Sequence, residues 1–143
     1  MKSGVASLAL TLAFASGAFA APPKPISVDE SASFLIDEAT SEKLWKENTP
    51  ASVVKLYPSK KFRFVSQVGG GFNEAKLCVV SARAMLLPVV TLPIQGAKLI
   101  YAPIKSSTAF DALPNLSKEQ CQELARTKLK EAIQSVAASL VAS

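Results

Sequence analysis

The chain has 143 residues, with 16 lysines and arginines against 11 aspartates and glutamates, two cysteines and no histidine. A chain of this length buries one hydrophobic core and no more. Without histidine, Ser-His-Asp and Cys-His catalysis and the usual zinc sites are excluded, so we expect neither a metal site nor a cofactor.

The first 20 residues have the pattern of a secretory signal peptide. Lys2 precedes an apolar run from Val5 to Phe14, and Ala-Phe-Ala at 18–20 matches an A-x-A cleavage site. The alternative is an uncleaved anchor, but the uncharged stretch is about the minimum that spans a bilayer, and no basic flank follows it. We expect cleavage after Ala20, a periplasmic or secreted protein, and no transmembrane segment after cleavage.

Residues 21–40 are expected to form a loosely structured leader before a single α+β domain at 41–143. The leader begins with a proline-rich run that discourages regular structure. Within 28–40 a short helix and a short strand both fit the pattern, and the choice stays open. Apolar residues at helical spacing over 41–57, interrupted by Thr49 as an N-cap and Pro50 at the first helical position, predict two short helices.

The middle of the chain predicts strands. Residues 61–68 alternate apolar and polar side chains with period two, and a second strand follows at 75–87, ended by Pro88. The glycines at 69–71 are expected to form a wide hairpin loop rather than a phosphate-binding nest, because a strand and not a helix follows them. A turn at 93–96 and a third strand at 97–104 complete this region.

The segment after residue 116 predicts the clearest helix. Ser117 and Gln120 have the spacing of a capping box, and Glu119 favours a helix start. One stripe of this helix is apolar and includes Cys121, Ala125, Leu129, Ala132, Ile133, Val136 and Leu140.

The two cysteines are predicted to form a disulfide. Cys121 faces inward in the first turn of this helix, and Cys78 shares a strand face with Val80, Ala82, Ala84 and Leu86. A redox-active thiol or a two-cysteine metal site is the alternative, but the chain has no C-x-x-C motif. In an oxidising compartment the bond persists and pins the helix onto the sheet.

These patterns predict an α+β fold. We expect a small antiparallel sheet of three or four strands, a long C-terminal helix packed on one face, short N-terminal helices at an edge or on the other face, and one disulfide.

Positive charge is concentrated on the predicted sheet. From Asn48 to Phe110 there are eight lysines and arginines and one acid, whereas 21–47 holds three cations and six acids. Alternation puts Arg63, Arg83 and Lys98 on the face opposite Cys78, with Val65, Val79 and Ile100 between them. This face either binds an acidic partner or is neutralised by the acidic N-terminal segment.

The leading hypothesis is a non-enzymatic exported protein that acts by binding, such as an accessory, inhibitor or immunity-type factor. The candidate binding residues are Lys60, Lys61, Arg63 and Arg83, and the expected partner is an acidic protein or an anionic envelope component. Nucleic acid is not expected, because the chain is exported and has no recognised binding motif. Association with an anionic membrane or glycan surface through Lys60, Lys61 and Arg63 is an alternative.

A small hydrolase is the alternative from another functional class. Ser52 and Lys55 match S-x-x-K, although the companion motifs S-D-N and K-T-G are absent. The acidic pairs 29–30 and 37–38 fit an acid/base site only in composition, since adjacent side chains on a strand point apart. We expect no catalytic residue from either pattern.

Overall fold

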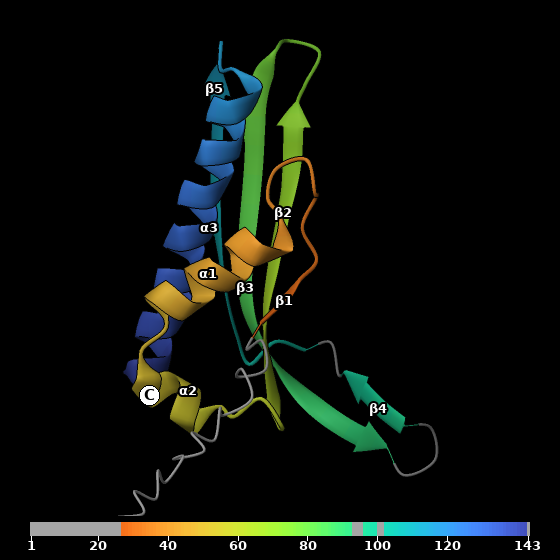
Figure 1. Cartoon of the computed structure of the whole chain (residues 1–143), viewed down its shortest axis with the longest axis vertical. Helices are drawn as coiled ribbons and strands as arrows, with labels where there is room; N and C mark the ends of the chain where they lie inside the picture. Colours follow the sequence, from red (N-terminus) through yellow and green to blue (C-terminus); the bar gives the residue numbers. More distant parts are fainter. Residues whose placement is uncertain (1–26, 93–95, 100–101, 143) are drawn as a thin grey trace, which may run out of the picture.

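The computed structural model describes residues 27–92, 96–99 and 102–142, so the predicted signal peptide lies outside the described residues. In chain order the elements are β1 (Ser27–Asp29), α1 (Glu38–Asn48), α2 (Ala51–Leu56), β2 (Phe62–Phe72), β3 (Leu77–Leu92), β4 (Gly96–Leu99), β5 (Lys105–Pro114) and α3 (Lys118–Val141). The long helix α3 runs along the sheet, with α1 beside it (Figure 1). The predicted α+β class with a long C-terminal helix is confirmed.

The sheet is mostly antiparallel. Strands β1, β2, β3 and β5 lie in that order, and both β2–β3 and β3–β5 are antiparallel. The short β1 is the exception, because it pairs with β2 in parallel. Beyond Phe62, where β2 begins, strand β3 continues and pairs with β4 instead. The predicted sheet is therefore present, with one parallel pair at its edge.

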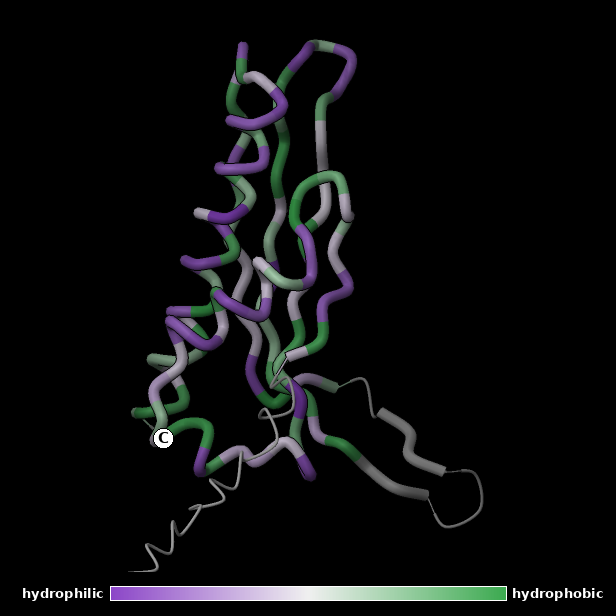
Figure 2. The backbone as a smooth tube through the Cα atoms, in the orientation of Figure 1, coloured by the Kyte–Doolittle hydropathy of each residue, from purple (hydrophilic) through white to green (hydrophobic). Residues whose placement is uncertain are grey.

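The main core lies between the sheet and the helices. All seven residues of the predicted stripe on α3 are buried, as are Cys78 and the four strand residues predicted to share its face. Figure 2 shows the corresponding alternation of hydrophobic and hydrophilic residues along α3. The disulfide between Cys78 and Cys121 joins the two patterns, with a Cα–Cα distance of 5.7 Å that is usual for such a bond. The predicted pairing is confirmed.

The described part of the predicted leader is more ordered than expected. β1 pairs with β2 over Ser27–Asp29, and α1 begins at Glu38 rather than at Ser41 because the Asp37 carboxylate accepts the Thr40 backbone N–H at 2.8 Å. Between them, Leu35 and Ile36 are 1% and 4% exposed. Burial of two large apolar side chains holds this segment on the sheet, which corrects the expectation of a loose leader for 27–40.

Helix α1 packs on the same face as α3, and not on the other face of the sheet. The Trp45 ring lies 4.9 Å from the Phe64 ring between ring centroids. The indole N–H of Trp45 and the hydroxyl of Ser41 both donate to Ser66 Oγ, at 2.7 and 2.9 Å. All three polar groups are buried, so this small network fixes α1 against β2.

The glycines at 69–71 belong to β2 rather than to a loop, which corrects the predicted hairpin. β2 runs to Phe72, and the turn is formed by 73–76. Gly70 and Gly71 have φ of 125° and 133°, and a Cβ at Gly70 would collide with the backbone carbonyl of Val79. Close approach of two strands, not a turn, therefore requires glycine here.

The last strand was also placed wrongly. The described strand residues of the predicted third strand are in β4, whereas 105–114, for which no strand was predicted, forms the ten-residue β5. β5 is an edge strand whose alternate residues are exposed, so its serines and threonine are compatible with pairing to β3. β3 continues through Pro88, which has no backbone N–H to donate. β5 pairs with β3 only as far as Leu86, so the proline costs no hydrogen bond between these two strands.

Candidate functional site

Three of the four candidate binding residues lie together at one end of the molecule. Lys60 and Lys61 are exposed in the turn between α2 and β2, and Arg63 follows at the start of β2. Lys55 is exposed on α2, and Lys105 is exposed at the start of β5, in the same cross-strand row as Phe64. We call Lys55, Lys60, Lys61, Arg63 and Lys105 the basic end.

The basic end has no neutralising acid in its own segments. From Ala51 to Asn73 and from Leu77 to Phe110 the sequence contains no aspartate or glutamate. The ion pairs of the described residues all involve other cations, on α1 and α3. Repulsion among like charges disfavours this arrangement unless an anion is bound, so the cluster is a candidate site.

Arg83 does not belong to the basic end. The register confirms that Arg63 and Arg83 share the face opposite Cys78, but Arg63 pairs with Leu87 and Arg83 with Gln67. Four residues along a strand separate the two rows by about 13 Å. Val65, Met85 and Leu87 form a small buried cluster between them. Lys98 and Ile100 were expected to extend this face, but their side chains are not among those that the structure describes.

The acidic N-terminal segment does not cover the basic end in the described residues. Glu30 reaches the face of Arg83, where its carboxylate accepts a hydrogen bond from Gln67 at 2.7 Å. Asp37 caps α1, and Glu42 and Glu47 pair with lysines of the same helix. The predicted neutralisation is therefore limited to one carboxylate near Arg83.

A small pocket opens beside the basic end. It has a volume of about 50 Å³ and is lined by Val54, Tyr57, Ser59 and Phe64. The Tyr57 ring packs edge-on against Phe62, with centroids 5.2 Å apart. This volume suits a few atoms rather than an organic ligand or cofactor.

Local backbone contacts hold the turn that carries the lysines. The Arg63 guanidinium donates to the carbonyls of Ser59 and Phe62, and Lys61 N–H donates to the Pro58 carbonyl at 2.9 Å. The N-cap residue of α2 is Pro50, which has no capping side chain, and not Thr49 as expected. Thr49 is instead the C-cap residue of α1. Its Oγ1 is buried and has no hydrogen-bond partner within the described residues.

Leu56 is an exposed apolar residue that the sequence pattern did not predict. This residue is the last of α2, directly after Lys55, and 64% of it is exposed. A leucine in a helical segment is ordinarily assigned to the core, so the sequence pattern alone does not identify it as a surface residue. Its exposure becomes evident only when the packing of α2 is known.

The residues of the hydrolase alternative do not form a site. Ser52 and Lys55 are both exposed on α2, and no hydrogen bond joins their side chains in the described structure. Activation of a serine by a lysine requires the two side chains to lie within hydrogen-bond reach, and here they are not joined. Asp29 accepts a hydrogen bond from Ser31, while Glu30 and Asp37 have the separate partners described above. These carboxylates therefore do not converge.

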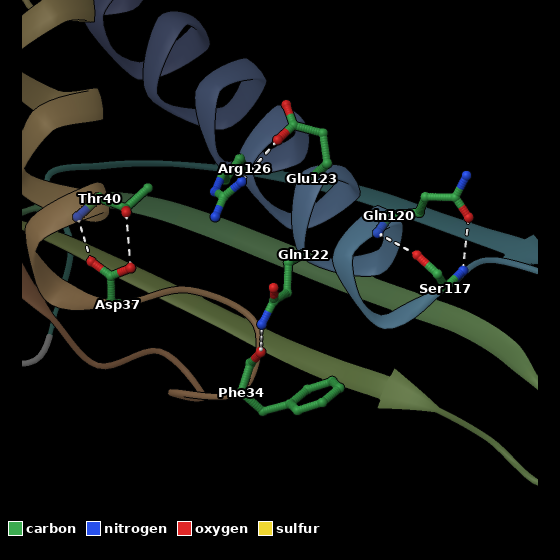
Figure 3. A network of polar contacts seen from close by, with 8 residues as sticks. All are labelled: Phe34, Asp37, Thr40, Ser117, Gln120, Gln122, Glu123 and Arg126. Carbon is green, nitrogen blue, oxygen red and sulfur yellow. Dashed lines mark hydrogen bonds and ion pairs between the residues drawn. The ribbon is translucent and has the colours of Figure 1, made fainter.

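Helix termini and the ion pairs of Lys128 account for the shifted pKa values. Figure 3 shows one of these termini, where the Asp37 carboxylate accepts two hydrogen bonds from Thr40. Hydrogen bonds from Thr40 lower the pKa of Asp37, and bonds from its own backbone N–H and from Ser117 lower the pKa of Glu119. A hydrogen bond to Glu131, supported by one to Asp111, raises the pKa of Lys128. Each shift has a structural cause away from the basic end.

Neither a metal centre nor a membrane-spanning helix is found within the described ranges. Among these residues no three Cys, Asp or Glu side chains are grouped to hold a metal ion. Their helices also lack the length and apolar character needed to cross a bilayer. Comparison with protein-family models, with curated proteins and with solved structures finds no match to this chain.

Proposed function

We propose that the protein is a non-catalytic binding protein of an exported compartment and that the basic end recognises a negatively charged partner. The observation that carries the proposal is the gathering of five lysines and arginines around one end, in segments that contain no acid. Such a cluster attracts anions and speeds their association.

Two further features support this proposal. A disulfide persists in oxidising compartments, which agrees with the predicted signal peptide. Three of the four carboxylates considered for acid/base chemistry, Asp29, Glu30 and Asp37, are instead engaged in hydrogen bonds of the fold. An accessory, inhibitor or immunity-type factor needs only a recognition surface of this kind.

The experiment compares two variants that lose the same charge. Lys60→Gln/Lys61→Gln alters the basic end. Lys76→Gln/Lys118→Gln alters two exposed lysines elsewhere, one in the turn between β2 and β3 and one at the first residue of α3. The oxidised protein from residue 21 onward is eluted with salt from immobilised poly-L-glutamate. We expect the first variant to elute at clearly lower salt than the second. Equal shifts for both variants would show that retention follows net charge and would overturn the proposal.

A further inference from the structure

We infer that the partner of the basic end is an anionic phospholipid surface, on which Leu56 inserts between the lysines. This inference rests on the proposed function and adds the chemistry of the partner. It starts from two properties of α2: Leu56 is 64% exposed, and Lys55, Lys60 and Lys61 lie within five residues of it.

The exposed leucine is not explained by folding. Leaving it in water forgoes the stabilisation that burial of a leucine side chain provides. Within α2, Val53 is completely buried, whereas Leu56, the last residue of the helix, is left uncovered by the rest of the fold. A large apolar side chain surrounded by lysines is the arrangement by which peripheral proteins enter the boundary between lipid headgroups and acyl chains.

A second exposed apolar residue lies at the same end. Val141, the last residue of α3, is 57% exposed, and α3 contacts α2. Figure 1 shows α2 next to the C-terminal end of α3, at one extremity of the described helices. Two separate elements therefore present exposed apolar side chains at this end of the molecule.

The shape of the site favours a surface over a small ligand. The pocket beside the basic end holds only about 50 Å³, whereas pockets for organic ligands have several hundred. The lysines lie on a turn and a helix end rather than inside a cleft. Positive charge near an anionic bilayer contributes about fivefold in binding for each lysine or arginine, and the effect falls off with added salt.

The test uses sedimentation with vesicles. The oxidised protein from residue 21 onward is mixed at low salt with vesicles of equal parts phosphatidylglycerol and phosphatidylcholine, or of phosphatidylcholine alone. We expect binding to the acidic vesicles only, lost on adding salt. Lys60→Gln/Lys61→Gln should weaken binding at least tenfold, and Lys76→Gln/Lys118→Gln by clearly less.

Leu56 is tested against a matched apolar residue. Phe110 on β5 is also 64% exposed, so Phe110→Ser is the control for Leu56→Ser. We expect only Leu56→Ser to weaken vesicle binding. A Leu56→Trp variant gives a second measurement, because its fluorescence should shift to the blue with acidic vesicles, whereas Trp45 is already fully buried. Equal effects of both serine variants, or no blue shift, would overturn insertion of Leu56.

The outcomes separate this inference from the proposed function. Retention on poly-L-glutamate without binding to acidic vesicles would overturn the lipid inference and leave an acidic protein as the partner. Binding to neither would overturn both. Vesicle binding that ignores salt and the lysine substitutions would also contradict the inference, because it would not be electrostatic.

Discussion

The two ends of the sheet are built differently. At the disulfide end, the bond between Cys78 and Cys121 joins the start of β3 to the start of α3. The Ser117–Gln120 capping box closes the first turn of α3, and Gln122 donates to the Phe34 carbonyl at 2.8 Å, which ties the helix to the segment between β1 and α1 (Figure 3). At the basic end, α2 has six residues, no side-chain cap and an exposed leucine.

This difference indicates a division of roles. Covalent and hydrogen-bonded contacts at the disulfide end stabilise the fold, so the basic end can keep unpaired cations and exposed apolar surface for binding. Substitutions at the first end should change stability and leave binding intact, and those at the second should do the reverse. The predictions below test this division, from the largest effect to the smallest.

The largest effect is expected from removal of the disulfide. Cys78→Ala/Cys121→Ala opens a loop with a sequence separation of 43 residues. The chain-entropy estimate is a loss of about 4 kcal/mol in the free energy of unfolding, measured by urea denaturation. A loss below about 1 kcal/mol would show that the helix and sheet hold this end without the bond.

Gly70 gives the next largest effect. Gly70→Ala places a Cβ against the Val79 carbonyl at a backbone φ of 125°, so we expect a loss of about 2 kcal/mol or more. Gly69→Ala is the matched control, because a Cβ there meets nothing within 4 Å. Similar thermal stability of the two variants would contradict the close approach of β2 and β3.

Ser66 tests the polar network that joins α1 to the sheet. Ser66→Ala leaves the buried Trp45 indole N–H and Ser41 hydroxyl without their acceptor, which should cost about 1–3 kcal/mol. Denaturation followed by Trp45 fluorescence measures this loss. Ser52→Ala, at an exposed position, is the control and should be within about 0.5 kcal/mol of the unmodified chain.

Between α1 and α2, Thr49→Val is expected to be neutral or stabilising. The Thr49 hydroxyl is buried without a hydrogen-bond partner, so replacing it with a methyl group removes a desolvation cost of up to about 1 kcal/mol. Valine suits the extended backbone at this position, with φ of −110° and ψ of 116°. Destabilisation by this substitution would reveal a polar partner for the hydroxyl.

The smallest effect concerns acid stability. The pKa values of Asp37 and Glu119 are lowered by hydrogen bonds, so their stabilising effect is present above their ordinary pKa values of 3.8 and 4.5 and is lost as the pH falls through the folded-state values. Asp37→Asn/Glu119→Gln should flatten the decline of stability below about pH 4.5. Glu74→Gln is the control. If the stability of the double variant fell with decreasing pH as steeply as that of this control, the assignment would be contradicted.

Regular patterns made part of this fold predictable. The stripe on α3 and the alternation around Cys78 each extend over several residues, and the two cysteines allow one pairing, so α3, the central strand and the disulfide follow from the sequence. Lys60, Lys61 and Arg63 are close in the chain, which places them together whatever the fold.

Features that depend on distant partners were not predictable. Gly70 resembles a loop residue until Val79 lies against it, and the serines of β5 resemble a connection until β3 pairs with them. The separation of Arg83 from Arg63 depends on the strand register. Leu56 is identified as a surface residue only by the packing of α2, which no local pattern determines.

The division between the two ends is tested most directly by hydrogen–deuterium exchange of the oxidised protein with and without phosphatidylglycerol-containing vesicles. The account predicts slower amide exchange in residues 51–63, which carry Leu56 and four of the five basic-end cations, and no change in residues 73–80 around Cys78. Slower exchange at the disulfide end with no change in 51–63 would contradict it.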